Sequence, residues 1–382
     1  MIDQPIPFLT HFAQVTDPRV DRTKRYSLPD ILFLCVCAVL CGADDCVSIA
    51  EFGQYRYQWL TQFTSFGDDI PSHDTISRVL SLLDPQEFEQ AFVAWVAAIQ
   101  SKSGGQIVAI DGKTMRRTFD AATGQKAIHM VSAWGSANGL VLGQVKTDEK
   151  SNEITAIPKL LEMLDIAGCT ITIDAMGTQK DIAQQIIDKE ADYVLPVKDN
   201  HPNLRADIEA FFERAIAGRW KDEHDEPIAH SSNTTFDADH GRSETRKCLC
   251  TDVLDDILDA KAWKGLRTIA RIETQRTING KTSTECRYYI SSLSPKAKRI
   301  NQAVRTHWGV ENNLHWVLDV AFDEDRCRTR KNSGAEIRAA LNRIAINLCK
   351  ADTTKKIGIK NKRKAAGWNP EYLTTLIKGA KI

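Results

Sequence analysis

Two aspartates in the sequence each follow a short apolar run, the pattern of a buried strand that ends in a carboxylate. Asp111 comes after residues 107–110, and Asp174 comes after residues 171–173. One aspartate in such a place is usually a turn or helix cap. Two carboxylates held close together repel each other unless a cation lies between them. Oxygen ligands suit Mg²⁺ or Mn²⁺, and a pair of such ions can support phosphodiester cleavage.

The tripeptide Gly112-Lys113-Thr114 directly after Asp111 could instead be the end of a P-loop in an NTPase. A P-loop needs a glycine five positions before Gly112, because the backbone of a glycine-rich loop wraps the phosphates. Ile107 occupies that position, inside the apolar run. We therefore do not expect ATP turnover, and we expect Asp111 to be the functional residue of this stretch.

A third acid would complete the ligands of a metal pair, and Glu311 is the best candidate. On an α-helix, Trp308, Glu311 and His315 would share one face, so aromatic and imidazole groups would surround this carboxylate. Asp319 and Glu324 are rival acids further along the chain. The sequence alone favours Glu311 over both of them.

The order of the elements predicts an α/β protein with a ribonuclease-H-like mixed sheet and flanking helices. In that fold the first and fourth strands are neighbours, which would bring Asp111 and Asp174 together. A Ser-Ala-Asn-Gly turn predicts a hairpin between the second and third strands, and Ser151 is the expected cap of the first helix. The pattern of the sequence predicts strands at residues 106–110, 129–134, 140–146, 170–174 and 193–197. Helical periodicity predicts helices at residues 153–164, 179–189 and 203–215.

The chain is expected to contain four segments. They are an all-helical N-terminal domain that could bind DNA (1–102), a catalytic core (103–228 and 295–350), a β-rich insertion (229–294) and a basic C-terminal segment (351–382). Helices are predicted at 28–40 and 87–99, with a shorter one at 71–80 capped by Ser72 or Asp74. Gly104-Gly105 is the expected linker, and residues 278–281 predict a hairpin turn.

Charge is unevenly distributed along the 382 residues, although Lys plus Arg equals Asp plus Glu at 50 each. Residues 301–382 contain 16 basic and 8 acidic side chains, so they carry +8 and the first 300 residues carry −8. A basic surface suits phosphate backbones, and a solvated basic tail is an equal alternative. The start lacks a secretory signal. The apolar run 31–41 is too short to span a bilayer, so we expect a cytoplasmic protein without a membrane partner.

Metal-binding patterns other than the acids are weak. His307, Glu311 and His315 have a spacing compatible with zinc, but a catalytic zinc site needs three converging ligands and none is obvious. Ten cysteines without an export signal indicate free thiols in a reducing compartment. We expect the crowded cysteines to be small core residues rather than zinc ligands: Cys35, Cys37, Cys41 and Cys46.

Several longer motifs resemble those of bacterial insertion-sequence DDE transposases, in the branch of the H-repeat-associated proteins. The resemblance covers nearly the whole chain. Its motifs are residues 8–53, IVAIDGKTMRR (107–117), HMVSAW (129–134), KSNEITAIP (150–158), TIDAMGTQKDIA (172–183), ADYVLPVKDN (191–200) and HWGVENNLHWVLDVAFDEDRCR (307–328). It implies that Asp111, Asp174 and Glu311 are catalytic acids that bind Mg²⁺, for which Mn²⁺ can substitute. It also implies double-stranded DNA as partner, both element ends and target, and a homodimer that pairs two ends.

The resemblance further implies phosphate contacts from basic side chains, although a solvated surface residue is an alternative for each. The candidates are Lys113, Arg116, Arg117, Lys198, Arg305, His315, Arg326, Arg328, Arg330 and Lys331, and the run 360–364. Many relatives carry the pattern Y-x₂-R-x₃-E-x₆-K around the glutamate. This chain has Val304, His307 and Leu318 at those positions, so Arg305 and His315 would take over the phosphate contacts.

The activity implied by the resemblance is cleavage at the element end by water, followed by attack of the freed 3′-OH on target DNA. Two alternatives remain open. One is a metal nuclease of the same fold that cuts without joining, and the other is a domesticated DNA-binding protein with a decayed site. The presence of all three acids argues against decay.

Overall fold

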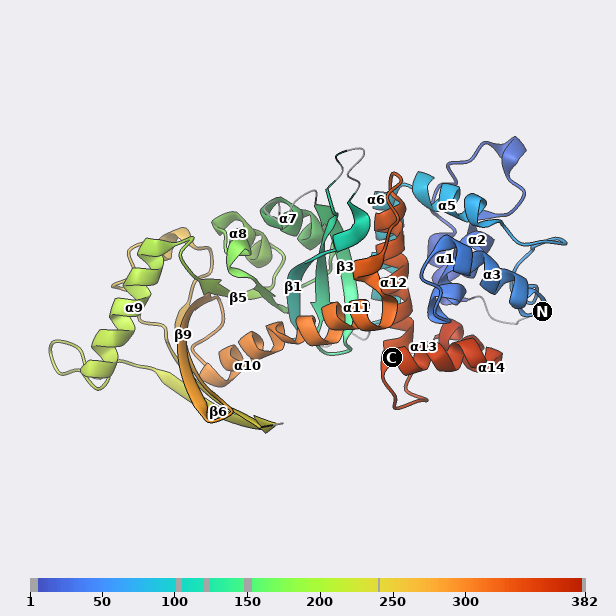
Figure 1. Cartoon of the computed structure of the whole chain (residues 1–382). Helices are drawn as coiled ribbons and strands as arrows, with labels where there is room; N and C mark the ends of the chain where they lie inside the picture. Colours follow the sequence, from blue (N-terminus) through green and yellow to red (C-terminus); the bar gives the residue numbers. More distant parts are fainter. Residues whose placement is uncertain are drawn as a thin grey trace. The chain divides into compact units, whose positions relative to one another are not determined.

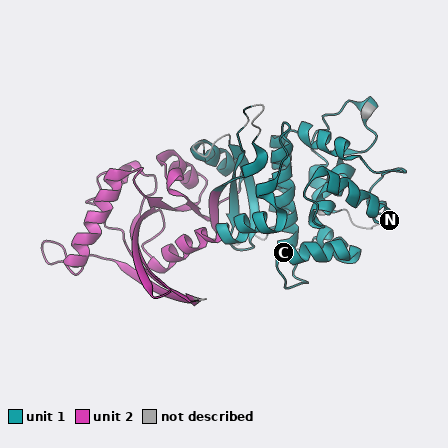
Figure 2. Cartoon of the chain, in the orientation of Figure 1, with its two compact units in different colours: residues 1–103, 112–164, 310–382 teal, residues 104–111, 165–309 magenta. Residues whose placement is uncertain are grey.

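The computed structural model describes residues 6–100, 105–119, 124, 126–147, 153–239 and 241–379. Figure 2 shows two compact units: unit 1 is Met1–Ser103, Gly112–Leu164 and Val310–Ile382, and unit 2 is Gly104–Asp111 and Asp165–Gly309. The expected linker residue Gly104 and the expected cap Ser151 lie outside the described residues. The four segments expected from the sequence remain a prediction about domains.

The strands form a mixed sheet in the order β3-β2-β1-β4-β5-β9-β8-β7-β6. β2 and β3 are antiparallel, whereas β4 lies parallel to both β1 and β5. The order 3-2-1-4-5, with strands one and four adjacent, confirms the predicted ribonuclease-H-like fold. The strand bounds are β1 (Ile107–Thr114), β2 (His129–Gly135), β3 (Leu140–Thr147), β4 (Thr170–Ile173), β5 (Asp192–Val197), β6 (Ser231–Asp239), β7 (Arg242–Thr251), β8 (Thr268–Ile278) and β9 (Lys281–Ser291).

Strand β1 is longer than its apolar run. Its pairing with β4 stops at Ile110, but the strand continues through Asp111 to Thr114. The expectation that the strand ends before Asp111 is therefore wrong, because a continuous apolar run marks only the fully buried part of a strand. The Gly112-Lys113-Thr114 tripeptide is extended, which agrees with the rejection of a P-loop.

The β-rich segment extends the same sheet. β6 to β9 form an antiparallel meander, and β9 pairs with β5. The predicted turn between β8 and β9 is confirmed: Asn279 and Gly280 both have positive φ, 50° and 76°, as a two-residue hairpin turn of type I′ requires. Helix α10 packs on β6 and β7 of this segment (Figure 1).

Helices cover the sheet within each unit. In unit 1, α7 packs on β2 and β3, and α12 packs on β3; in unit 2, α8 packs on β5. The apolar side chains of α10 that enter the core are Ile300, Ala303 and Val304, at the spacing that puts residues on one helical face. The helices around the sheet are α7 (Glu153–Met163), α8 (Lys180–Asp188), α9 (Pro202–Ala217), α10 (Ala297–His307), α11 (Trp316–Phe322) and α12 (Gly334–Ala351).

The N-terminal residues fold into helices, as predicted. α2 has the predicted bounds and is buried from Ile31 onwards. Of the four crowded cysteines expected in the core, Cys35 and Cys37 are buried free thiols, whereas Cys41 and Cys46 are free thiols that are only partly buried. The Ser72 hydroxyl accepts a hydrogen bond from the Thr75 amide at 3.3 Å and caps α5. Among the described helices, none is both long and apolar enough for a membrane crossing. The bounds are α1 (Pro7–Phe12), α2 (Leu28–Leu40), α3 (Cys46–Tyr55), α4 (Tyr57–Leu60), α5 (His73–Leu82) and α6 (Pro85–Ile99).

The basic run 360–364 lies in α13 (Ile359–Trp368), which is followed by α14 (Pro370–Lys378). Two of its cations are buried at the C-terminal ends of other helices. Lys362 Nζ donates to the Cys349 carbonyl at 2.9 Å, and Arg363 Nη2 donates to the Val39 carbonyl at 2.7 Å. Helix ends leave carbonyls without partners and favour a nearby positive charge. The expectation that these two residues contact DNA is therefore wrong.

Replacing Lys362 by methionine should lower the free energy of unfolding by roughly 2 kcal/mol, because it removes a charged donor from buried carbonyls. Chemical denaturation would measure this loss. Lys364→Met is the matched control, since Lys364 is exposed in the same helix and should change stability by less than about 0.5 kcal/mol. Equal losses in both variants would contradict the capping role of Lys362.

Candidate active site

The two strand-borne acids begin from adjacent backbone positions. β1 and β4 run parallel in a register that pairs Ile110 with Ile173. The residue after Ile110 is Asp111, still in β1, and the residue after Ile173 is Asp174, directly beyond the end of β4; paired strands are about 4.8 Å apart. Asp111 is half-buried, and the Asp174 side chain is 51% exposed. The structure thus brings these two acids together where the paired parts of β1 and β4 end.

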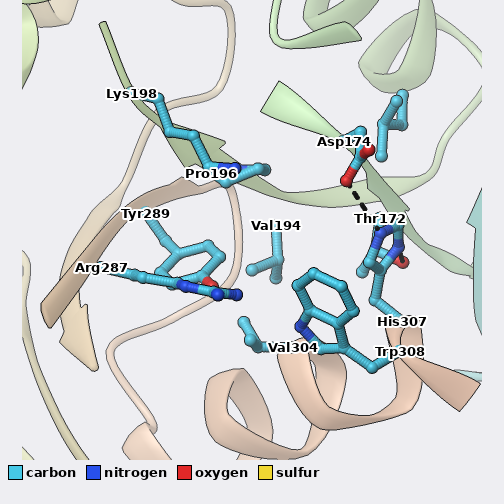
Figure 3. A pocket seen from close by; sticks show the side chains of 11 residues that line it. Thr172, Asp174, Val194, Pro196, Lys198, Arg287, Tyr289, Val304, His307 and Trp308 are labelled. Atoms are coloured by element: carbon cyan, nitrogen blue, oxygen red, sulfur yellow. Dashed lines mark hydrogen bonds and ion pairs between the residues drawn. The ribbon is translucent and has the colours of Figure 1, made fainter. Parts of the chain in front are cut away.

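Asp174 occupies the capping position of the short helix η4 (Ala175–Gly177), but its carboxylate makes no capping hydrogen bond. Instead, His307 Nε2 lies 3.5 Å from Asp174 Oδ1 (Figure 3). The other ring nitrogen of His307 is 3.1 Å from the Thr172 hydroxyl. Thr172 on β4 thereby holds the buried imidazole against the carboxylate, so Asp174 is oriented by its neighbours rather than used as a helix cap.

A pocket opens beside Asp174 in unit 2 (Figure 3). The Arg287 guanidinium lies 5.0 Å from the ring centre of Trp308, a cation–π contact. Burial raises the pKa of the Tyr289 phenol to about 12. Two cations near the carboxylate suit a phosphate group. The lining residues are Thr172, Ile173, Asp174, Val194, Pro196, Lys198, Arg287, Tyr289, Val304, His307 and Trp308.

Glu311 is exposed and begins η6 (Glu311–His315), a π-helix in unit 1. The expectation that an α-helical face surrounds it is wrong, because π-type i→i+5 bonding changes which residues align along the helix. Such π segments are frequent at functional sites. Within unit 1 the rival acids are engaged elsewhere: Asp319 pairs with Lys113 at 2.7 Å, and Glu324 is fully buried against Arg343.

Lys113 was expected to contact phosphate, but its side chain is buried in ion pairs within unit 1. Its side chain is 8% exposed and pairs with Asp319 at 2.7 Å and Asp325 at 3.0 Å. Burial raises the pKa of the Asp319 carboxyl. Arg116 is 79% exposed and lies 3.3 Å from Asp325. A phosphate could therefore reach Arg116, whereas Lys113 serves mainly to join β1 to α11.

The other basic candidates differ in exposure. Arg117, Lys198, Arg328 and Lys331 are exposed, and His315 is half-buried. Arg326 lies 3.6 Å from Asp323, and Arg330 stacks 5.7 Å over the Phe119 ring. Arg305 is half-exposed and pairs with Asp237 and Glu244 in unit 2. Each of these side chains keeps some surface that could meet a phosphate.

A buried pair beneath β1 was not foreseen from the sequence. His129 Nε2 and Glu153 Oε1 are 2.7 Å apart, and their side chains are 3% and 6% exposed. The other ring nitrogen of His129 lies 2.8 Å from the Thr114 hydroxyl. This chain of contacts holds the last residues of β1 in unit 1. Both residues lie in motifs that the resemblance covers, which was the signal available.

Asp111 and Asp174 supply the hard oxygen donors that Mg²⁺ and Mn²⁺ prefer, and their adjacent strand positions fit a shared cation. Across the described parts of the chain, no group of three or more His, Cys, Asp or Glu side chains is placed around a possible metal position. The geometry observed within unit 2 is therefore a pair of acids with His307 against one of them.

Family models and related proteins that match this chain indicate a transposase. A family model described as "Transposase DDE domain" matches residues 102–348, and one described as "DDE_Tnp_1-associated" matches residues 9–96. The chain is 42% identical over 373 residues to the protein named "Putative transposase YncI" of Escherichia coli O157:H7, covering 97% of this chain and 94% of that one. It is 39% identical over 379 residues to "H repeat-associated putative transposase YhhI" of Escherichia coli K12, covering 98% of each.

Among solved structures, a piggyBac transposase synaptic complex with hairpin DNA aligns with a TM-score of 0.41 and 12% identity, over 97% of this chain and 77% of that chain. The sequence matches, which span nearly the whole chain, are the findings that assign the family. The chain belongs to the DDE transposase family, in its H-repeat-associated branch.

Proposed function

We propose that this protein is a metal-dependent DNA transposase in which Asp111, Asp174 and Glu311 hold Mg²⁺ or Mn²⁺. The observation that supports it most is the β1–β4 register, which sets two acids side by side in a chain of the DDE family. Glu311 is included because of its sequence motif. Its rivals, Asp319 and Glu324, are engaged by internal cations.

The side chains around Asp174 prepare the site for a phosphodiester. His307, held by Thr172, fixes the carboxylate. Lys198 and Arg287 line the same pocket and would attract the DNA backbone. Bound divalent cations would supply an activated water and stabilise the leaving oxygen. The Asp111 and Asp174 carboxylates repel each other when ionised, and together with Glu311 they would hold such cations.

The proposed reaction has two steps at one site. Water cleaves the phosphodiester at the end of the element and frees a 3′-OH. That hydroxyl then attacks a phosphodiester of target DNA: its oxygen bonds to the phosphorus, the P–O3′ bond of the target breaks, and a 3′-OH of the target leaves as the element end is joined. Double-stranded DNA, as element end and as target, is the proposed partner, and pairing of two ends implies a homodimer in the complex.

An assay with the protein's own element tests this proposal. The purified chain is mixed with Mg²⁺, a duplex carrying the inverted repeats that flank its gene, and a target plasmid, and the products are sequenced. We expect free 3′-OH ends at the repeats and joined products in the plasmid. Cleavage without joining would favour the nuclease alternative, and DNA binding without cleavage would favour the domesticated derivative.

A further inference from the structure

One buried carboxylate in unit 2 is surrounded by arginines. Glu244 on β7 is 5% exposed and accepts from Arg242, from Arg246 at 3.0 Å and from Arg276 at 3.1 Å. Arg305 of α10 approaches it to 3.5 Å. Arg242 and Arg246 lie on the same sheet face as Glu244 because alternate residues of β7 share a face. The β7–β8 register sets Arg276 opposite Glu244.

This cluster has more positive than negative charge. The four arginines face three acids, Glu244, Asp237 and Glu285, of which Asp237 pairs with Arg305. Arg246 is 9% exposed, and in the described structure its Nε and Nη1 groups have no hydrogen-bond partner. Burial lowers the pKa of Arg246, and the nearby Arg305 adds to this. The buried charge of Arg246 adds to the positive potential at the exposed Arg242 and Arg276, where a further anion would be stabilised.

The cluster continues towards the Asp174 pocket on the same sheet face. The register pairs Arg287 of β9 with Ile272 of β8, and Ile272 lies on the face that carries Arg276, four residues further on. Glu285 accepts from Arg287 at 2.8 and 3.0 Å and also interacts electrostatically with Lys198 and Arg276, so it connects the pocket to the cluster. We name these cations the arginine track: Lys198, Arg242, Arg246, Arg276, Arg287 and Arg305.

We propose that the arginine track binds the sugar-phosphate backbone of the DNA that reaches the Asp174 site. The inference rests on the proposed function and adds the surface that holds the duplex. Guanidinium groups match phosphate oxygens with two parallel hydrogen bonds. Such contacts position a duplex without reading its sequence. Glu244 keeps the arginines on one face, and their excess charge is available to phosphates.

The double variant Arg242→Gln/Arg276→Gln tests the track, because these side chains are 49% and 44% exposed. Binding to a short mixed-sequence duplex is measured by fluorescence anisotropy in EDTA at several salt concentrations. We expect about tenfold weaker binding at low salt. The slope of log affinity against log salt should become shallower by about 2, one for each lost phosphate contact. Arg305→Gln, which alters α10 instead of a strand, should reduce the slope by about 1.

Lys247→Gln is the matched control, because Lys247 is exposed on the opposite face of β7. It should bind as the wild type does. Wild-type affinity and slope in the double variant and in Arg305→Gln would overturn the inference, and so would an equal loss in Lys247→Gln. A wild-type chain that binds no DNA would overturn the proposed function instead, so the two failures can be told apart.

Discussion

Replacing Asp174 by asparagine should reduce metal-dependent DNA cleavage by about a thousandfold while leaving DNA affinity nearly unchanged. Asparagine keeps the size of the side chain but removes the charge that holds a cation. The same result is expected for Asp111→Asn and Glu311→Gln. Single-turnover cleavage of an end-bearing duplex, with anisotropy to measure binding, would check it. A variant that still cleaves at the wild-type rate removes its residue from the proposed site.

Metal binding gives a second measurement that does not depend on catalysis. Mn²⁺ titration followed by electron paramagnetic resonance should show weaker binding in Asp174→Asn, by about tenfold to a hundredfold. Asp181→Asn is the matched control, because Asp181 is an exposed acid at the start of α8 in the same unit. Unchanged Mn²⁺ binding in an Asp111→Asn/Asp174→Asn double variant would contradict the proposed metal site.

The two aspartates could be predicted from the sequence because the signals that place them are local. Each follows a short apolar run, and the order of strands and helices sets β1 beside β4. The local structure at Glu311 could not be predicted in this way. A π turn inserts one residue into a helix, which a 3.6-residue apolar pattern does not reveal.

Contacts between residues far apart in the chain explain why other predicted roles differ from those in the structure. Lys113 looks like a phosphate contact in the sequence, but it is buried against Asp325, 212 residues later. Lys362 and Arg363 belong to a basic run, yet they bind carbonyls of other helices. Arg287 and Tyr289 were missed because residue alternation in a strand does not say which face meets the site. The β8–β9 register is needed to show it.

Gly112→Ala should destabilise unit 1 by about 3 kcal/mol, and so lower its melting temperature by roughly 6–12 °C. A Cβ at this position would lie 2.2 Å from His129 Nε2 and 2.5 Å from Glu153 Oε1. Both groups are buried and bonded to each other, so the alanine must push apart a pair whose side chains are only 3% and 6% exposed. Calorimetry would measure the change, and Gly67→Ala is the control because nothing lies within 4 Å of its Cβ position.

The loss of stability expected from the side-chain clash can be separated from a loss caused by the backbone conformation of Gly112. Gly112 is not among the glycines with positive φ, so alanine is allowed at its backbone conformation and the cost should come from the clash alone. In a His129→Ala background the closest clash is removed and Glu153 is no longer held in place by the imidazole. Gly112→Ala should then cost much less, which gives a coupling energy of about 1–3 kcal/mol in a double-mutant cycle. An equal cost in both backgrounds would show that the glycine is needed for another reason. A large coupling would mean that the buried pair fixes the path of β1 immediately after Asp111, and thus the position from which that carboxylate begins.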